Sequence, residues 1–233
     1  MMGEDYAGVQ AKEQEPIRIN ANELFTKVFF RMFLGLFATA AIAGFTFYSG
    51  MILNIVESGA YVGIIIAEFV VVLAFSLGFR KFSASTVSFL YFAYACLTGV
   101  TFSCIFAVFE LESIMLAFAS TAAVFGVLAY IGKNTQRDLT NFGTILYAAL
   151  IVGVIVSVIN LFIGNSFLDI VLDWTMLAIF MGLTVYDMNK ITAMADSEIT
   201  EKDKLYVYGA MQLYLDFINI FIRLLSLFGK RRN

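Results

Sequence analysis

The chain has 233 residues, of which 61% are hydrophobic and 14% charged, and its mean hydropathy is +0.85. This composition excludes an ordinary soluble domain and predicts a membrane protein that crosses the bilayer several times. The formal net charge is -3, and there is no histidine, which excludes Ser-His-Asp hydrolysis, histidine-ligated zinc and histidine-based pH sensing.

Seven apolar segments are each long enough to cross about 30 Å of hydrocarbon as a helix. We therefore expect an all-α membrane protein with seven transmembrane helices and short connections. The expected spans are residues 30–52, 60–79, 84–108, 113–132, 143–164, 168–191 and 204–228. They form one domain over residues 30–228, between a polar cytosolic segment, residues 1–29, and a basic tail, residues 229–233.

The charges of the connections predict the orientation in the membrane. The connections that follow spans two, four and six carry basic residues, namely Arg80, Lys81, Lys133, Arg137, Lys190, Lys202 and Lys204. Those after spans one, three and five carry none, so the positive-inside rule places the N-terminus in the cytosol. The basic tail then lies outside if the seventh segment crosses. A re-entrant seventh segment is the alternative, but its length favours crossing.

The last span contains an acid at its midpoint, Asp216, within the sequence GAMQLYLDFINIFIRLLSLFG. A carboxylate at this depth costs at least ~2.5–3.5 kcal/mol, so it is treated as a functional residue. The polar residues around it recur at helical spacing and lie within about 80° of one face. This stripe comprises Tyr208, Gln212, Asp216, Asn219 and Arg223. It must face a partner helix or a watery cavity, and Arg223 is expected to pair with an acid or to reach the membrane interface.

A second acid, Asp187, lies near the cytosolic end of span six in the sequence GLTVYDMNK. Thr184 lies one turn earlier on the same face and can hydrogen-bond it. Spans six and seven form an antiparallel hairpin, which can bring Asp187 and Asp216 together. Two carboxylates in a low dielectric repel each other, so we expect the pair to share one proton. A hydrogen bond through that proton would tie the two spans together at one protonation state.

The sequences TVYDMNKI and GAMQLYLDFINIFIRLLSLFG, with Thr-Gly-Val-Thr at residues 98–101, closely resemble the Bax inhibitor (transmembrane Bax inhibitor motif) family. This resemblance covers nearly the whole chain. It implies that the last helix is central and surrounded by the other six. It also implies that Asp187 and Asp216 form a pH-sensitive latch on a calcium leak path. Bacterial members are plasma-membrane proteins, and we expect this chain to be one of them.

Two further charged residues, Glu68 and Arg80, lie in or directly after span two. Bacterial relatives place an arginine late in span two that helps to gate the latch, whereas Gly78 or Phe79 stands near that point here. Arg80 can take the role only with a small shift. Glu68, in the middle of span two, is either a pathway residue or a carboxyl satisfied by a neighbouring helix.

Calcium takes 6–8 oxygen ligands. Asp187 and Asp216, with the side-chain amides of Gln212 and Asn219, offer oxygens of the right kind. Because few carboxylates converge, we expect weak and transient calcium binding and no cofactor. The expected partners are membrane lipid, calcium ions, protons and, in one alternative, another membrane protein, with no nucleic acid.

Three functions remain open at this stage. The expected one is a pH-sensitive calcium leak without enzymatic activity. A membrane regulator that binds a protease or a death-pathway protein without transporting ions is an alternative. An intramembrane aspartyl protease is a distant third, because Leu213, Tyr214 and Leu215 precede Asp216 where those proteases carry Gly-x-Gly. The polar stripe can also be read simply as polar contacts between helices.

Overall fold

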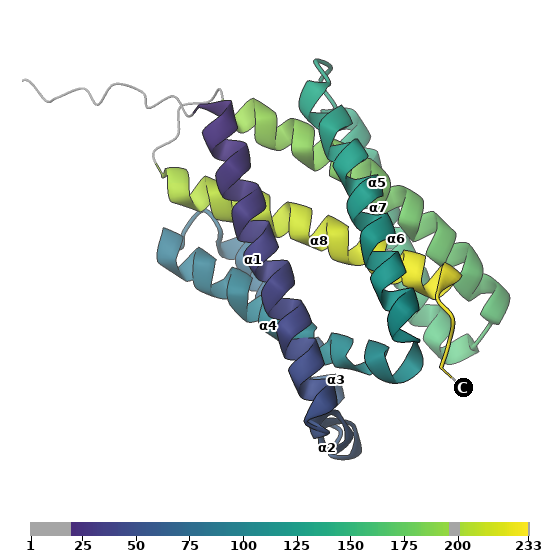
Figure 1. Ribbon diagram of the computed structural model, residues 1–233. Coiled ribbons are helices and arrows are strands. Elements are labelled where there is room, and N and C mark those ends of the chain that lie inside the picture. The colour runs from purple at the N-terminus through teal and green to yellow at the C-terminus, as the bar shows by residue number, and fades with distance from the viewer. Residues whose placement is uncertain (1–19, 196–200, 233) are drawn as a thin grey trace, which may run out of the picture.

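The computed structural model describes residues 20–195 and 201–232, and this part of the chain is built from helices (Figure 1). Seven of them are long and apolar enough to cross a membrane, which confirms the predicted all-α, seven-span class. The helices are α1 (Ala21–Tyr48), α2 (Met51–Glu57), α3 (Ala60–Gly78), α4 (Ala84–Val108), α5 (Leu111–Asn134), α6 (Thr140–Ile163), α7 (Ser166–Ala195) and α8 (Lys202–Phe228).

The first helix begins at Ala21, so residues 21–29 of the expected polar segment belong to α1. Asn20 caps it, because its side chain accepts a hydrogen bond from the backbone N–H of Asn22. Leu24, Phe25 and Val28 recur at helical spacing and are buried. Residues 1–19, the rest of the expected cytosolic segment, lie outside the described residues.

The connection between the first two spans contains the short helix α2, which was not expected. Gly50 and Gly59 precede α2 and α3 with φ values of 73° and 75°. A residue with a side chain rarely adopts this left-handed conformation, whereas glycine does so without strain. The two glycines therefore let the chain reverse twice in a few residues and place α3 beside α4.

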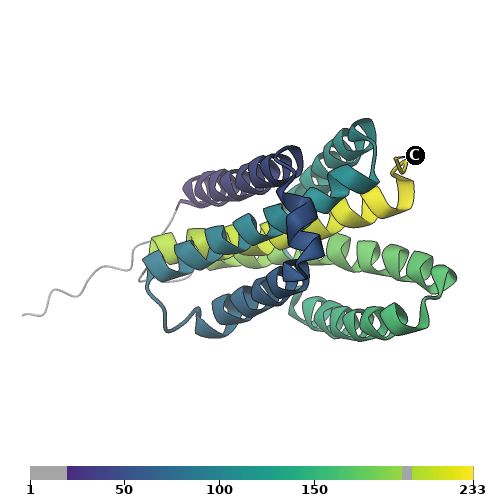
Figure 2. The same ribbon diagram turned by 90° about the horizontal axis from the view of Figure 1, so that it is seen from below.

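The last helix is the most buried span, whereas α3 and α6 are the most exposed. It packs directly against α1, α4, α5 and α7. The outer helices α3 and α6 pack on α4 and α7, respectively (Figure 2). They reach α8 through side chains, such as the ring of Phe79 against Tyr208 and the hydrogen bond between Gln212 and Tyr147. Four of the six other spans therefore surround the last helix directly.

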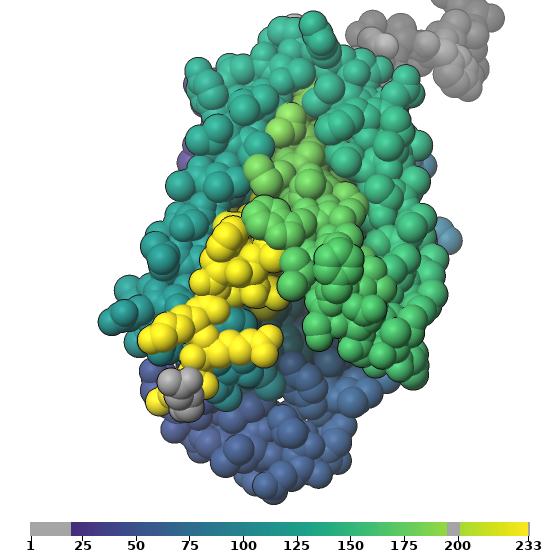
Figure 3. Space-filling model, turned by 90° about the vertical axis from the view of Figure 1, so that its right-hand side faces the viewer, coloured from purple at the N-terminus to yellow at the C-terminus, as the bar shows by residue number. Residues whose placement is uncertain are grey.

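The two ends of the last helix contact different parts of the molecule. Near its start, Asp203 pairs with Arg31 of α1 at 2.8 Å. Beyond its end, the backbone N–H of Glu110 donates to Lys230, and that of Arg232 donates to Val108. The tail therefore lies at the α4–α5 end (Figures 1 and 3). This arrangement corresponds to a crossing seventh span rather than a re-entrant one.

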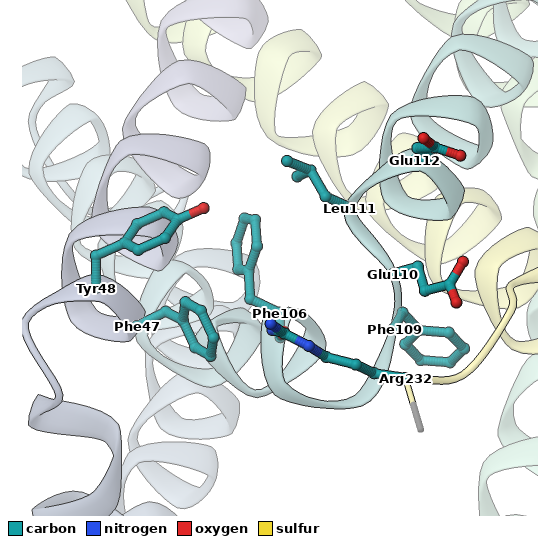
Figure 4. Close-up of a pocket in the computed structure, with 8 residues that line it drawn as sticks. All are labelled: Phe47, Tyr48, Phe106, Phe109, Glu110, Leu111, Glu112 and Arg232. Atoms are coloured by element: carbon teal, nitrogen blue, oxygen red, sulfur yellow. The ribbon is translucent and has the colours of Figure 1, made fainter.

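One residue of the basic tail, Lys230, pairs with an acid at this end of the molecule. The ammonium of Lys230 lies 2.8 Å from a carboxylate oxygen of Glu110. This hydrogen bond and the negative charge of Glu110 raise the pKa of Lys230. Arg232 extends along a pocket of about 510 Å³ whose walls include Phe47, Tyr48 and Phe106 (Figure 4). The positive-inside rule disfavours basic residues outside the cytosol. The negative charge of Glu110 neutralises that of Lys230 and so offsets part of this positive charge.

Gly132 is a point of close packing between α5 and α7. A Cβ atom at this position would overlap the backbone carbonyl oxygen of Val185 and lie 2.9 Å from the Cβ of Met188. We expect Gly132→Leu to force the helices apart and to lower the unfolding free energy by about 3 kcal/mol or more. Gly126, which faces open space on the same helix, is the matched control. Thermal unfolding in detergent measures both; equal stability of Gly132→Leu and Gly126→Leu would contradict the packing.

Candidate functional site

Asp187 and Asp216 are buried next to each other in the interface between α7 and α8. Each residue is 2% exposed. Gln212, one turn before Asp216 on α8, donates to the hydroxyl of Tyr147, which in turn donates to Asp187, so both acids lie in the same part of this interface. The antiparallel packing of α7 on α8 thus brings together two acids that are separated by 28 residues in the sequence (187 to 216).

Tyr147 of α6 completes this group of polar side chains. Its hydroxyl lies 3.3 Å from Oδ1 and 3.4 Å from Oδ2 of Asp187. The side-chain amide of Gln212 donates to the same hydroxyl at 3.2 Å. Hydrogen bonds therefore run from Gln212 to Tyr147 and from Tyr147 to Asp187, which links α8, α6 and α7. Close approach of α6 is possible because Gly143, one turn earlier, lies directly against the ring of Tyr186.

Lys190 places a positive charge on the same helix as Asp187. It follows Asp187 by three residues on α7, so both side chains lie on the same part of the helix surface, and their charges attract. The Lys190 ammonium donates to the hydroxyl of Tyr208 at 2.8 Å. It also lies 5.4 Å from the ring centroid of Tyr208 and 5.8 Å from that of Tyr186. Tyr208, the first residue of the predicted stripe, is thus the partner of a lysine.

Two of the predicted supporting residues bond within their own helices. Thr184 donates its hydroxyl hydrogen to the carbonyl oxygen of Phe180 at 2.8 Å, so the expectation that it hydrogen-bonds Asp187 is wrong. A buried threonine in a helix commonly satisfies its hydroxyl in this way. Asn219 donates to the carbonyl oxygen of Leu215 at 2.8 Å. The side-chain nitrogen of Asn219 therefore forms its hydrogen bond within α8.

Arg223 forms an ion pair two turns beyond Asp216. Its guanidinium lies 2.6 Å from a carboxylate oxygen of Asp173 on α7. The hydroxyl of Ser226 donates to the other oxygen of the same carboxylate. Arg223 was expected either to pair with an acid or to reach the membrane interface, and the structure shows the pair with an acid. This contact joins α7 and α8 at a second point, away from the aspartate pair.

Glu68 and Arg80 are not brought to the aspartates. Glu68 of α3 is half-buried and accepts a hydrogen bond from Thr101 at 2.7 Å. Thr101 is the last residue of the Thr-Gly-Val-Thr sequence of α4. Of the two readings of Glu68, the structure therefore shows the hydrogen bond to a neighbouring helix. Arg80 is exposed after α3, where its carbonyl oxygen accepts from Lys204. Within residues 20–195 and 201–232 it forms no ion pair with either aspartate. Phe79 instead packs on Tyr208, with ring centroids 5.0 Å apart.

The group can offer calcium two carboxylates, from Asp187 and Asp216, and neutral oxygens from Gln212 and Tyr147. In the described part of the chain, no three His, Cys, Asp or Glu side chains converge into a metal site. A calcium ion at the pair would need further oxygens, supplied by water, to reach its usual 6–8 ligands. The arrangement suits brief contact with a passing cation and exchange of a proton.

The geometry defines a class: a seven-span helical membrane protein with a buried aspartate pair between its last two helices. Comparison with known proteins identifies the family. Residues 21–233 match the family model described as "Inhibitor of apoptosis-promoting Bax1", and the chain therefore belongs to the Bax inhibitor family.

Bacterial relatives are similar along almost their whole length. The inner membrane protein YbhL of Escherichia coli K12 is 35% identical over 222 residues, which cover 92% of this chain and 94% of YbhL. An uncharacterized protein of Borreliella burgdorferi is 36% identical over 229 residues, covering 95% of this chain and 97% of the relative. A Rickettsia prowazekii protein is 33% identical over 212 residues, covering 89% of each chain.

Proposed function

We propose that this protein is a pH-sensitive calcium leak channel, without enzymatic activity, whose gate is the pair Asp187 and Asp216. One observation carries the proposal: two acids from different helices are buried in the same interface between two spans. Burying two carboxylates together is costly unless a proton or a cation compensates their charge. A cation path that is controlled by protons needs a site that can bind a proton at one time and a cation at another.

The pair closes the path when it holds one proton. A carboxyl of one aspartate then donates to the carboxylate of the other, and this hydrogen bond ties α7 to α8. Loss of the proton leaves two negative charges that repel each other and favour separation of the helices. The 2% exposure of both residues fits the closed form. A calcium ion that reaches the separated carboxylates is attracted by both, and the small number of ligands lets it leave again.

The cellular location belongs to the same proposal. YbhL is named as an inner membrane protein, which supports the plasma membrane of a bacterium for this chain. The N-terminus is assigned to the cytosol because the basic residues lie in the connections after α3 and α5 and in the helix ends on the same side, including Lys190 of α7 and Lys202 of α8. The aspartate pair then lies nearer the cytosolic end of α7.

Calcium entry into dye-loaded proteoliposomes tests the proposal directly. We expect the wild-type protein to give a flux that changes across about pH 5.5 to 8, and the double variant Asp187→Asn/Asp216→Asn to give a flux independent of pH. Protein-free liposomes and the lipid-facing variant Gly126→Leu are the controls. Absence of wild-type flux at every pH would overturn the leak channel and favour a membrane regulator that binds another protein. A pH profile unchanged in the double variant would overturn the gate.

A further inference from the structure

We propose that the pocket beside the C-terminal tail binds the phosphate headgroup of a membrane phospholipid, through the guanidinium of Arg232 and the hydroxyl of Tyr48. This pocket is formed by the end of α1, the end of α4, the start of α5 and the tail (Figure 4). The proposal does not involve the aspartate pair. It is tested by lipid binding without any calcium flux, so it can fail while the channel proposal stands, and the reverse.

The backbone of the tail holds Arg232 at the pocket. The N–H of Arg232 donates to the carbonyl oxygen of Val108 at 2.8 Å. Beside this bond, Phe109 and Arg231 pair as two antiparallel strands do. In such extended backbone, successive side chains point to opposite sides. The side chain of Arg232 accordingly lines the pocket, whereas that of Arg231 does not.

The guanidinium of Arg232 has no anionic partner in the part of the chain that the structure describes. Its side chain donates one hydrogen bond there, from Nη1 to the carbonyl oxygen of Phe106 at 3.5 Å. The acids that line the pocket act on a different cation. Glu110 pairs with Lys230 at 2.8 Å and raises its pKa, and the charge of Glu112 adds to this effect. A guanidinium with free donors is well suited to bind a phosphate.

The acids and the guanidinium also lie at different sides of the pocket. Figure 4 shows Glu110 and Glu112 at the start of α5, with the side chain of Leu111 between them and α1. The side chain of Arg232 extends away from Glu110, so that its nitrogen atoms lie beside Phe106. A phosphate bound to the guanidinium therefore lies on the aromatic side, remote from the two carboxylates.

Three aromatic side chains form this side of the pocket. The rings of Phe47 and Phe106 stack with centroids 5.6 Å apart, and the ring of Tyr48 lies 5.3 Å from that of Phe47. Tyr48 is exposed, and its hydroxyl has no hydrogen-bond partner within residues 20–195 and 201–232. Tyrosines at the ends of spans commonly lie at the level of the lipid headgroups. The free hydroxyl can donate to a phosphate oxygen.

The pocket continues onto apolar surface that faces lipid. Leu111 at its edge and Met115, one turn further along α5, are both exposed. On α1, Gly44 lies one turn before Tyr48 and faces open space. A phospholipid can place its phosphate at Arg232 and its acyl chains along this surface, whereas a free phosphate ion would leave it uncovered. These contacts favour a phospholipid over a soluble phosphate.

Size and charge agree with such a ligand. The cavity of about 510 Å³ falls within the range of small-molecule sites, which is about 300–1,000 Å³. With the orientation proposed above, the pocket lies in the leaflet that faces away from the cytosol, where basic residues are disfavoured. A phosphate at Arg232 would neutralise its charge there, as Glu110 does for Lys230.

Native mass spectrometry of the delipidated protein in detergent tests the proposal, with dioleoylphosphatidylglycerol as the probe. Arg232→Gln and Arg231→Gln remove the same charge from neighbouring positions, so Arg231→Gln is the matched control. We expect Arg232→Gln to weaken binding of the first lipid about tenfold, because it removes a charge-assisted hydrogen bond. Arg231→Gln should change it less than about twofold. Equal weakening in both variants would overturn the site, because binding would then follow the net charge of the tail.

Two further probes separate the phosphate from the acyl chains. Dioleoylglycerol has the same chains without the phosphate, so it should bind wild type and Arg232→Gln equally. A loss of dioleoylglycerol binding in Arg232→Gln would overturn phosphate recognition. Inorganic phosphate, added at the concentration of the lipid, should not displace it. Displacement would show that the pocket recognises the free anion and would overturn the assignment to a phospholipid.

Tyr48→Phe tests the second contact. It keeps the aromatic ring and removes the hydroxyl, so we expect binding of the first lipid to weaken about threefold. Unchanged binding would overturn the role of the hydroxyl. Thermal unfolding in detergent confirms that each variant is folded.

Discussion

Asp216→Asn is expected to keep calcium flux low at the alkaline end of the pH range, where the wild-type protein conducts. The asparagine amide can donate to the Asp187 carboxylate as a protonated Asp216 would, but it cannot lose the proton. Opening controlled by one proton changes the flux by at most about tenfold per pH unit. The variant should therefore differ from the wild-type protein by about tenfold at one pH unit above the wild-type transition.

Asp187→Asn is the matched partner of that experiment. It removes one of the two carboxyl groups, so ionisation of Asp216 no longer creates repulsion between them. We expect flux in this variant to be flat with pH, whereas Asp216→Asn keeps the titration of Asp187. Calcium flux measured at closely spaced pH values separates the two profiles. An alkaline rise that survives in Asp216→Asn would contradict this account of the gate.

Asp173→Ala is expected to cause a large loss of stability. Its carboxylate accepts from Arg223 and Ser226, and the side chains of Asp173 and Arg223 are only 12% and 25% exposed. Removing one partner of a buried ion pair typically costs 3–5 kcal/mol, and the partial exposure of Arg223 reduces this to about 2 kcal/mol. For a chain of this size we expect the thermal transition in detergent to fall by roughly 4–8 °C.

Two controls separate the buried pair from a general effect of lost charge. Asp203 is 72% exposed in its pair with Arg31, so Asp203→Ala should cost less than about 1 kcal/mol. The double variant Asp173→Leu/Arg223→Met removes both charges and should recover most of the stability lost in Asp173→Ala. If Asp173→Ala and Asp203→Ala unfold at the same temperature, the ion pair does not stabilise the contact between α7 and α8.

The sequence predicts the spans well where apolar runs are long and end at turn residues. The fourth helix occupies the expected residues, 84–108, and the third ends one residue before the expected boundary. The start of α1 differs because charged residues interrupt its first turns, which hides the buried positions Leu24 and Val28. The short helix α2 is too brief to give a hydrophobic period, so composition does not separate it from the preceding span.

The candidate site was found in part because acids within a span are conspicuous. Asp187 and Asp216 have this signal, whereas Tyr147 does not, because one tyrosine in an apolar span has many ordinary roles. Only the packing of α6 on α7 brings its hydroxyl to Asp187. Lys190 had a signal, the spacing of three residues from Asp187 on a helix. Its place near the end of span six also makes it one of the charges that predict orientation, and the sequence gives no reason to prefer the other role.

A reversible cross-link between α7 and α8 tests the central claim most directly. Cysteines at both gate positions, Asp187→Cys/Asp216→Cys, are placed in a Cys96→Ala/Cys104→Ala background, which removes the two free native cysteines. Mass spectrometry confirms the link, and calcium flux is measured before and after reduction. Separation of the two helices at this point opens the path, so the linked protein should not conduct at any pH, and reduction should restore flux without pH dependence. Equal flux in the linked and reduced forms would show that the pair is not the gate.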